Sequence, residues 1–273
     1  MGPLLTAKIL EKLRAAARTG VPVVECSLDL QRSISKVCVD AEGWSWNGRR
    51  FGLPGKWNER TIYHWINEGF EPVARYSNSL IKLVPTEWGP PTFEIDGIKM
   101  LPTAKGSPYA DAEVKVGYIE PRGKCILDTC GGLGYFAAWC MQGQAKQVLS
   151  FEKNADVIWL RSLNPWSPQQ GHGLILKLAD ITAEIMLLPD RSCDAILHDP
   201  PRIGIAGELY SQVFYDQLVR VLKVRGKLFH YTGSPNKLTS QRDVPNEVAG
   251  RLRRAGFTTQ LKGDGVLGVK TGF

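Results

Sequence analysis

The sequence predicts an α/β fold with a small, mostly β region ahead of it, and three observations support this. From residue 119 onward, apolar runs typical of strands alternate with helical patterns. Such alternation predicts a mainly parallel sheet with helices on both faces. Several of the apolar runs end at an acidic residue, and the first of them enters a glycine-rich turn at residues 131–134. The second half of the chain therefore predicts a sheet whose carboxyl edge carries polar groups.

The composition excludes several classes of protein. Of the 273 residues, 43% are hydrophobic and 22% are charged, which is ordinary for a soluble globular protein. No apolar run reaches the ~20 residues that a membrane-spanning helix needs, and the N-terminus lacks the order of a secretory signal. The six cysteines form no C-x-x-C pair, so we expect reduced thiols, no zinc site or other metal, and a cytoplasmic protein.

The net charge of +7 is concentrated near the C-terminus. Residues 220–273 hold eleven Lys or Arg against three Asp or Glu. A solvated basic face would explain this, and so would a surface for RNA or another acidic partner. Charge alone does not separate the two interpretations.

Residues 1–105 are predicted to form an N-terminal helix and a small β-rich accessory domain. Residues 4–18 have helical amphipathic spacing, and a second short helix is expected at 58–67, capped by Asn58. Strands are expected at 35–39 and 80–84, and hairpins at 44–51, around Asn47-Gly48, and at 93–100. The tryptophans of this region either fill a small core or contact a substrate.

Residues 106–273 are predicted to form the second domain, in which strands and helices alternate. The expected strands are 125–128, 147–151, 174–178, 194–198 and 227–231, followed by an antiparallel pair at 257–261 and 266–270. The expected helices begin at 135 and cover 155–163, 209–222 and 244–255.

Acidic residues follow four of the predicted strands. They are Asp128, Glu152, Asp180 and Asp199. Because the carboxyl ends of parallel strands meet in one crevice, we expect these acids to lie near a common ligand. An acid after the second strand can bind both ribose hydroxyls, one after the third lies near an adenine amino group, and Asp128 suits a cationic amino-acid end. S-adenosyl-L-methionine (SAM) has these three parts.

This arrangement resembles the class I SAM-dependent methyltransferases and implies their Rossmann-like sheet. The segment Asp128-Thr129-Cys130-Gly131-Gly132-Leu133-Gly134 looks like the first motif of that family, with Cys130 where glycine is usual. By this resemblance the cofactor-binding residues are Asp128, Thr129, Gly131, Gly132, Gly134, Glu152, Lys153, Asp180, Ile181 and Asp199.

The segment Asp199-Pro200-Pro201-Arg202 resembles the motif of enzymes that methylate nitrogen on bases or amides. Two prolines would hold the backbone rigid, so that fixed acceptors orient an N–H nucleophile. Three features occur in the same order as in a largely archaeal group of predicted methyltransferases, which the chain therefore resembles. They are Asn164-Pro165-Trp166-Ser167, His198 directly before this segment, and Tyr210. The catalytic residues that the resemblance implies are Asp199, Pro200, Pro201, Arg202 and Tyr210.

Other functions stay open on the sequence alone. RNA is the first acceptor that we expect, followed by a protein side chain or a small amine. Aminopropyl transfer from decarboxylated SAM uses the same type of sheet, and a binding module without chemistry is a third alternative. Gly132-x-Gly134-x-x-Ala137 fits a dinucleotide fingerprint only loosely. His198 is expected to be structural, His230 either a core or a catalytic residue, and Arg202 either a partner of Glu208 or a ligand for an acidic acceptor.

Overall fold

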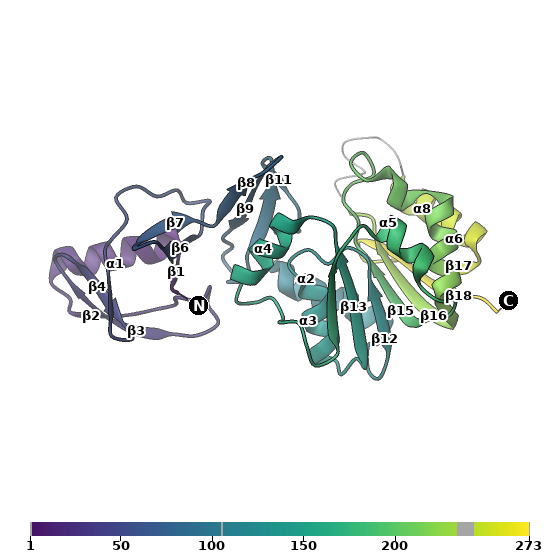
Figure 1. Ribbon diagram of the computed structural model, residues 1–273, viewed down its shortest axis with the longest axis horizontal. Helices are drawn as coiled ribbons and strands as arrows, with labels where there is room; N and C mark the ends of the chain where they lie inside the picture. The colour runs from purple at the N-terminus through teal and green to yellow at the C-terminus, as the bar shows by residue number, and fades with distance from the viewer. Residues whose placement is uncertain (1, 105, 234–242, 273) are drawn as a thin grey trace. The chain divides into compact units, whose positions relative to one another are not determined.

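The computed structural model describes residues 2–104, 106–233 and 243–272, and these form two compact units (Figure 1). The N-terminal unit comprises Met1–Asp111 and Trp159–Trp166. The C-terminal unit comprises Ala112–Ile158 and Ser167–Phe273. Helix α4 (Ala155–Leu163) contributes its second half to the N-terminal unit. Residue 105, at the predicted domain boundary, and residues 234–242 of the basic segment lie outside the described residues.

The N-terminal unit contains helix α1 (Ala7–Thr19) and three small antiparallel sheets. Their strand orders are β1-β6-β7, β2-β3-β4-β5 and β11-β10-β9-β8. The bounds are β1 (Leu4–Leu5), β2 (Val23–Cys26), β3 (Ser35–Asp40), β4 (Gly43–Trp46), β5 (Arg49–Phe51), β6 (Tyr63–Ile66), β7 (Gly69–Pro72), β8 (Ala74–Tyr76), β9 (Leu80–Val84), β10 (Thr92–Ile95) and β11 (Ile98–Lys99).

The predicted hairpins of this unit are present, because their turn residues adopt the left-handed conformation that tight turns require. Asn47 and Gly48 have φ values of 49° and 72° between β4 and β5. Asp96 and Gly97 have φ values of 48° and 78° between β10 and β11. Both pairs suit the two-residue turns that match the twist of a hairpin.

Two predictions for this unit were wrong. Residues 58–67 form no helix. The Asn58 side chain accepts a hydrogen bond from the Arg60 backbone (2.8 Å) in a local turn, and β6 then pairs with β7. Residues 4 and 5 do not begin α1, because they form β1 and pair with β6, and the extended Thr6 separates them from the helix. In both places long-range strand pairing overrides a local helical pattern.

The C-terminal unit is built on a seven-stranded sheet in the order β14-β13-β12-β15-β16-β18-β17. All neighbouring strands are parallel except β18, which is antiparallel to both of its neighbours. The strand bounds are β12 (Cys125–Asp128), β13 (Gln147–Glu152), β14 (Leu174–Leu178), β15 (Cys193–His198), β16 (Leu222–Tyr231), β17 (Phe257–Lys262) and β18 (Gly265–Lys270).

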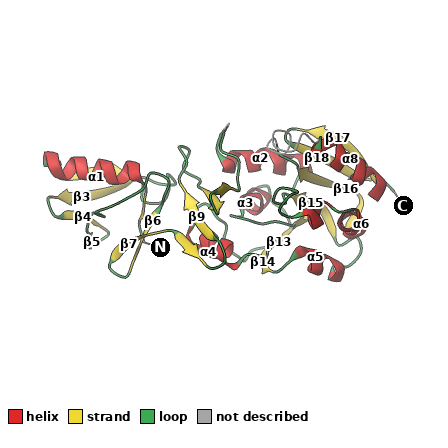
Figure 2. Ribbon diagram, turned by 90° about the horizontal axis from the view of Figure 1, so that it is seen from above, coloured by secondary structure: helices red, strands yellow, loops and turns green. Residues whose placement is uncertain are grey.

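Helices surround this sheet, as Figure 2 shows in red against the yellow strands. They are α2 (Pro108–Ile119), α3 (Tyr135–Gln142), α5 (Ile181–Glu184), α6 (Gln212–Val221) and α8 (Val244–Ala255), with short 3₁₀ turns η1 (Ile185–Leu187) and η2 (Gly207–Tyr210). The predicted helix at 209–222 was too long at its start. The Ser211 hydroxyl accepts a hydrogen bond from the Phe214 backbone (3.1 Å) and caps α6, and η2 precedes it.

The packing of the core explains why these strands could be predicted from the sequence. Leu127, Ile196 and Leu228 lie side by side on β12, β15 and β16 and pack in one cluster with residues of α5, α6 and α8. Alternate residues point to the opposite face, where Tyr118 of α2 packs against Phe229 of β16 with ring centroids 5.1 Å apart. Both faces of the sheet are therefore covered, which gives the continuous apolar runs of a buried parallel sheet.

Candidate functional site

The carboxyl ends of the parallel strands meet where the strand order reverses. From β12 the chain moves outward to β13 and β14, then returns to β15 on the other side of β12. In an open α/β sheet this reversal point is where ligands bind. The residues at or just after the ends of β12, β13, β14 and β15 are those that the sequence singled out.

The glycine-rich turn is fixed between two neighbouring strands. The Thr129 backbone N–H donates to Leu197 O of β15 (3.1 Å), and the Gly131 N–H donates to Phe151 O of β13 (2.7 Å). Gly132 and Gly134 have φ values of 49° and 82°, which is the left-handed region that glycine adopts most easily. The turn ends at the N-terminus of α3, so its backbone lies at the edge where a ligand would approach.

Glu152 holds this turn from the end of β13. Its Oε2 accepts a hydrogen bond from the Gly132 N–H (3.0 Å), and its Oε1 accepts one from the Asn154 N–H (2.9 Å). The carboxylate is half-buried. The acid after the second strand therefore lies directly against the glycine turn.

Asp180 and Ile181 stand at the start of α5. Oδ1 of Asp180 accepts hydrogen bonds from the Thr182 N–H (2.9 Å) and the Thr182 hydroxyl (2.8 Å), while Ile181 is buried. Partial burial alone would raise the pKa of Asp180, but the bonds from Thr182 and the charge of Lys153 lower that pKa below its ordinary value. The carboxyl group is thus kept ionised at the surface.

Lys153 lies between two acids of different elements. Its Nζ is 3.9 Å from Oδ2 of Asp180 and 3.9 Å from Oε1 of Glu208 in η2. The sequence left open a pairing of Glu208 with Arg202, and the structure pairs Glu208 with Lys153 instead. Arg202 is exposed.

Asp128 is fully buried, at 0% exposure. Its Oδ2 accepts a hydrogen bond from the Ser150 hydroxyl of the neighbouring strand (2.7 Å). The structure thus places Asp128 beneath the glycine turn. Ser150 is a contact that the sequence did not reveal, because nothing in an apolar strand marks one serine as a carboxylate partner.

The segment Asp199-Pro200-Pro201-Arg202 is held from within the unit by Tyr210. The Tyr210 hydroxyl donates to Pro201 O (3.1 Å), and the side chain is 1% exposed. Burial, together with the negative charge of Asp199, raises the pKa of Tyr210 above its ordinary value. Tyr210 therefore stays a neutral donor that orients the segment, while Asp199 is half-buried at the carboxyl end of β15.

Two buried histidines lie beneath this segment. His198 Nε2 lies 3.1 Å from Leu209 O, and its Nδ1 lies 2.7 Å from the Thr129 hydroxyl. Because a carbonyl only accepts, Nε2 carries the proton and Nδ1 accepts from Thr129. Burial lowers the pKa of His198 to about 4, so the ring is neutral near pH 7. This agrees with the structural role expected for His198.

His230 is also a core residue. It lies 2.9 Å from the Tyr215 hydroxyl through Nε2 and 2.8 Å from Tyr231 O through Nδ1, and it packs against His198 with ring centroids 4.4 Å apart. Burial, and then the neighbouring His198, lower its pKa well below the ordinary value. The sequence left two roles open for His230, and the structure shows it as a core residue.

Within the described residues of the basic C-terminal segment, five cations make internal contacts. Arg220 donates to Leu188 O (2.8 Å) and Ile185 O (2.7 Å), and Lys270 donates to Val219 O (2.7 Å) and Leu222 O (2.8 Å). Further pairs are Lys223 with Asp194 and Lys227 with Glu120, both at 2.6 Å, and Arg251 with Tyr210 O, also at 2.6 Å. These cations hold the fold together, which weakens the inference from net charge to RNA.

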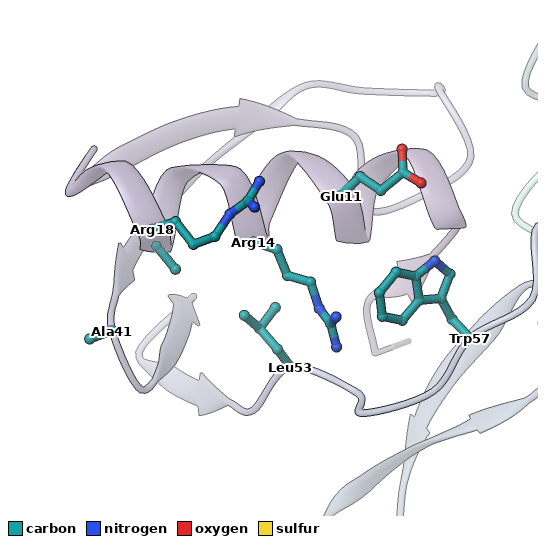
Figure 3. Close-up of a pocket in the computed structure, with 7 residues that line it drawn as sticks. Glu11, Arg14, Arg18, Ala41, Leu53 and Trp57 are labelled. Atoms are coloured by element: carbon teal, nitrogen blue, oxygen red, sulfur yellow. The ribbon is translucent and has the colours of Figure 1, made fainter.

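The N-terminal unit has a cleft of about 440 Å³ of its own (Figure 3). It is lined by Glu11, Arg14, Ala17, Arg18, Ala41, Leu53 and Trp57. The Arg14 guanidinium lies 3.8 Å from the centre of the Trp57 ring and donates to Pro54 O. Arg14 thus joins α1 to the loop after β5, and this contact is structural.

Across 2–104, 106–233 and 243–272, no group of three or more His, Cys, Asp or Glu side chains is placed to hold a metal ion. Within the same ranges, no helix is both long and apolar enough to cross a membrane.

Comparison with known proteins identifies a family and a fold. No family model matches the chain. An uncharacterized protein of Methanocaldococcus jannaschii is 41% identical over 215 residues, which cover 78% of this chain and 73% of that protein. The chain belongs to the same family as this archaeal protein.

Among solved structures, a spermidine synthase in complex with the transition-state analogue AdoDATO matches with a TM-score of 0.59 and 16% identity, over 72% of each chain. The spermidine synthase of Thermotoga maritima gives a TM-score of 0.55 and 16% identity, over 72% of this chain and 71% of that one. Several SAM-dependent methyltransferases match at TM-scores of only 0.39 to 0.46. The predicted fold class is confirmed: a Rossmann-like sheet like that of the spermidine synthases, with a small β-rich N-terminal region.

Proposed function

We propose that this member of the M. jannaschii protein's family is a SAM-dependent methyltransferase that methylates an N–H group held at Asp199-Pro200-Pro201-Arg202. The observation that carries the proposal is the convergence of four strand ends on one edge of the sheet. There the glycine turn is tied to Glu152 (Gly132 N to Oε2, 3.0 Å), and the Asp199 segment is tied to Tyr210.

The cofactor would be held from several strand ends. Glu152 would accept from the ribose hydroxyls, and Asp180 with Ile181 would border the adenine ring, with Lys153 beside them. The turn residues Thr129, Gly131, Gly132 and Gly134 would let the backbone approach the ligand closely. Asp128, buried under the turn, would add negative charge that favours the cationic part of SAM.

The bound sulfonium supplies an electrophilic methyl group, so the chain's own task is mainly positioning. Asp199 would accept a hydrogen bond from the acceptor N–H and turn its lone pair toward the methyl group. Pro200 and Pro201 restrict the backbone, and the Tyr210 hydroxyl fixes Pro201 O. Arg202, exposed at the end of the segment, would bind an acidic part of the acceptor.

RNA is the first acceptor that we would test, with a protein side chain or a small amine next. Residues 106–273 would carry the chemistry and residues 1–105 would serve as the accessory domain. The internal use of Arg220, Lys223, Lys227 and Lys270 leaves less free positive charge for RNA than the sequence suggested. We keep a cytoplasmic role in RNA modification as a prediction.

Aminopropyl transfer from decarboxylated SAM is a second candidate. The observation that favours it is the likeness of the sheet to spermidine synthases at TM-scores of 0.59 and 0.55. Such chemistry requires an acidic site for a polyamine acceptor, which Asp199 and Glu208 could supply in part.

The test combines binding with transfer. Methyl-labelled SAM would be incubated with the purified protein and with cell extracts separated into RNA, protein and metabolites. We expect label in one macromolecular or small-molecule fraction, and loss of that label with Asp199→Ala. Label in no fraction, together with transfer of an aminopropyl group from decarboxylated SAM to a diamine, would overturn the methyltransferase proposal.

A further inference from the structure

The cleft beside α1 in the N-terminal unit has no part in the proposed cofactor site. Its volume of about 440 Å³ lies within the range of ligand pockets, which is ~300–1,000 Å³. Leu53 and Ala17 give it apolar walls. Its other lining groups include two guanidinium groups and an indole ring, those of Arg14, Arg18 and Trp57. A cleft of this size and composition suits a small molecule or one unit of a polymer.

One side of α1 supplies the charged groups of the cleft. Glu11, Arg14 and Arg18 are spaced by three and four residues, so they lie on the same side of the helix. At ~1.5 Å of rise per residue, the distance from Glu11 to Arg18 along the helix is about 10 Å. Figure 3 shows Glu11 and Trp57 toward one end of the cleft and Arg18 toward the other, with Arg14 between the two ends. The cleft therefore has an acidic, aromatic end and a basic end.

Arg14 is fixed in the middle of the cleft by its structural contacts. Its guanidinium carbon lies 3.8 Å from the centre of the Trp57 ring. Its hydrogen bonds to Pro54 O and Gly55 O both come from Nη2. A guanidinium group has five N–H donors, and those on Nε and Nη1 have no partner within the described residues. Arg14 is thus a pre-organised cation with donors left for an anion.

Arg18 lies one turn further along α1 and is exposed. In the part of the chain that the structure describes, its side chain has neither a hydrogen-bond partner nor an ion-pair partner. Like charges at positions i and i+4 of a helix repel each other. An oxyanion between the Arg14 and Arg18 guanidinium groups would accept hydrogen bonds from both and offset this repulsion.

Two tryptophans of this unit are placed differently, which bears on the two roles that the sequence left open for them. Trp44 is fully buried and fills the core, whereas Trp57 is half-buried and lines the cleft. The bases of single-stranded RNA are recognised by stacking on aromatic rings and on guanidinium planes. Trp57 and Arg14 together present both kinds of surface.

We propose that this cleft binds one nucleotide of single-stranded RNA, with the base against Trp57 and the phosphate between Arg14 and Arg18. This inference rests on the proposed function, in which RNA is the first acceptor. The carboxylate of Glu11 repels the phosphate from the aromatic end and accepts a hydrogen bond from an amino group of the base, so it sets the direction of the nucleotide. RNA binding then does not depend on the C-terminal cations that make internal contacts.

The first test needs no variant. Fluorescence anisotropy would follow the full chain binding a labelled ten-nucleotide single-stranded RNA of alternating adenine and cytosine, with unlabelled competitors. This RNA should bind at least about tenfold more tightly than AMP or a ten-residue polyglutamate, because a strand adds phosphate and stacking contacts. Equal affinity for AMP would make the ligand a free nucleotide, and equal affinity for polyglutamate would show attraction to any polyanion. Either result overturns the proposal.

Calorimetry with SAM on the same sample separates this inference from the proposed function. A protein that binds SAM and does not bind the RNA would overturn the role of the cleft and leave the cofactor site standing. A protein that does not bind SAM would overturn the proposed function.

The second test assigns RNA binding to the cleft. Arg18→Gln should weaken RNA binding by about 5- to 10-fold and lower the slope of log affinity against log salt by about 0.7, because one phosphate contact is lost. The matched control is Arg49→Gln, which removes the same charge from an exposed position of β5 outside the cleft and should change neither value. Equal losses in the two variants would contradict the proposal, because they would show general attraction between charges.

The third test addresses the aromatic end. Trp57→Ala should weaken RNA binding by about 5- to 100-fold through lost stacking, while SAM affinity holds. Circular dichroism would confirm folding, and Arg18→Gln, which changes an exposed side chain, decides the matter if Trp57→Ala does not fold. Unchanged RNA affinity in a folded Trp57→Ala would overturn the placement of the base.

Discussion

The two units differ in how directly their sequence reports their structure. In the C-terminal unit the central strands β12, β15 and β16 are covered on both faces, so their apolar runs stand out in the sequence and their polar ends mark the edge of the sheet. In the N-terminal unit the strands are two to six residues long and belong to three small sheets. There, the structure depends on strand pairing between residues far apart in the sequence, such as Leu4 with His64, and no local sequence pattern predicts this pairing.

Their cores differ in the same way. The N-terminal core depends on packed aromatic rings: Trp44 stacks on Phe51 with ring centroids 4.5 Å apart, and Trp65 meets Phe51 edge to face with ring centroids 4.9 Å apart. The C-terminal core is mainly aliphatic and carries buried polar groups beneath the candidate site, such as His198. We expect damage to the first to cost stability alone, and damage to the second to cost binding and catalysis.

The largest effect should come from Trp44→Ala. Trp44 is fully buried, so its removal should lower the free energy of unfolding of the N-terminal unit by about 3–5 kcal/mol. Chemical denaturation followed by tryptophan fluorescence would measure this, with Trp88→Ala, whose side chain is 41% exposed, as the control. SAM affinity should not change, and a parallel loss of SAM binding would show that the two units do not work separately.

Acid should weaken the C-terminal unit through His198. In the unfolded chain His198 takes up a proton below about pH 6.5, whereas in the folded protein the buried ring does so only near pH 4. The contribution of the neutral ring to the free energy of unfolding is therefore complete above pH 6.5 and is lost as the pH falls toward 4. The loss should reach up to about 3 kcal/mol, measured as the free energy of unfolding across this pH range. His198→Gln should reduce that dependence and leave the part that comes from the buried His230, whose pKa is also lowered, and an unchanged slope in this variant would contradict the assignment.

Glu152→Ala should weaken SAM binding by about a hundredfold, because the carboxylate accepts one hydrogen bond from the Gly132 N–H of the turn and one from the Asn154 N–H, and is the proposed ribose ligand. Calorimetry would measure the affinity, with circular dichroism to confirm folding. Glu184→Ala is the control, since Glu184 forms a surface ion pair with Lys177 at 3.5 Å. The assignment fails if both variants bind SAM as the parent does.

Tyr210→Phe should have the smallest effect. It should lower the free energy of unfolding by about 1 kcal/mol, because it removes one hydrogen bond to Pro201 O without changing the packing. If that bond positions the Asp199 segment, the turnover number should fall several-fold while SAM affinity holds. Tyr215→Phe, which loses its bond to His230 instead, should keep full turnover. Equal turnover losses in the two variants would indicate general loosening of the core.

The candidate site was predictable to the extent that it lies at strand ends. Glu152 and Asp180 were expected near a ligand because each follows an apolar run, and the structure has both at the carboxyl edge. Asp128 was expected at that edge too, but its complete burial and its hydrogen bond from Ser150 of another strand were not expected. Contacts between distant segments, such as Thr129 with His198 and Lys115 with Tyr231, have no local signal and needed the structure.

The central claim is that the carboxyl edge of β12, β13 and β15 binds SAM, and a crystal structure of the full chain with S-adenosylhomocysteine tests it most directly. We predict the ribose hydroxyls on the Glu152 carboxylate, the adenine beside Asp180 and Ile181, and the sulfur directed toward Asp199. A ligand bound elsewhere on the chain, or an empty edge in crystals soaked at saturating concentration, would contradict the account.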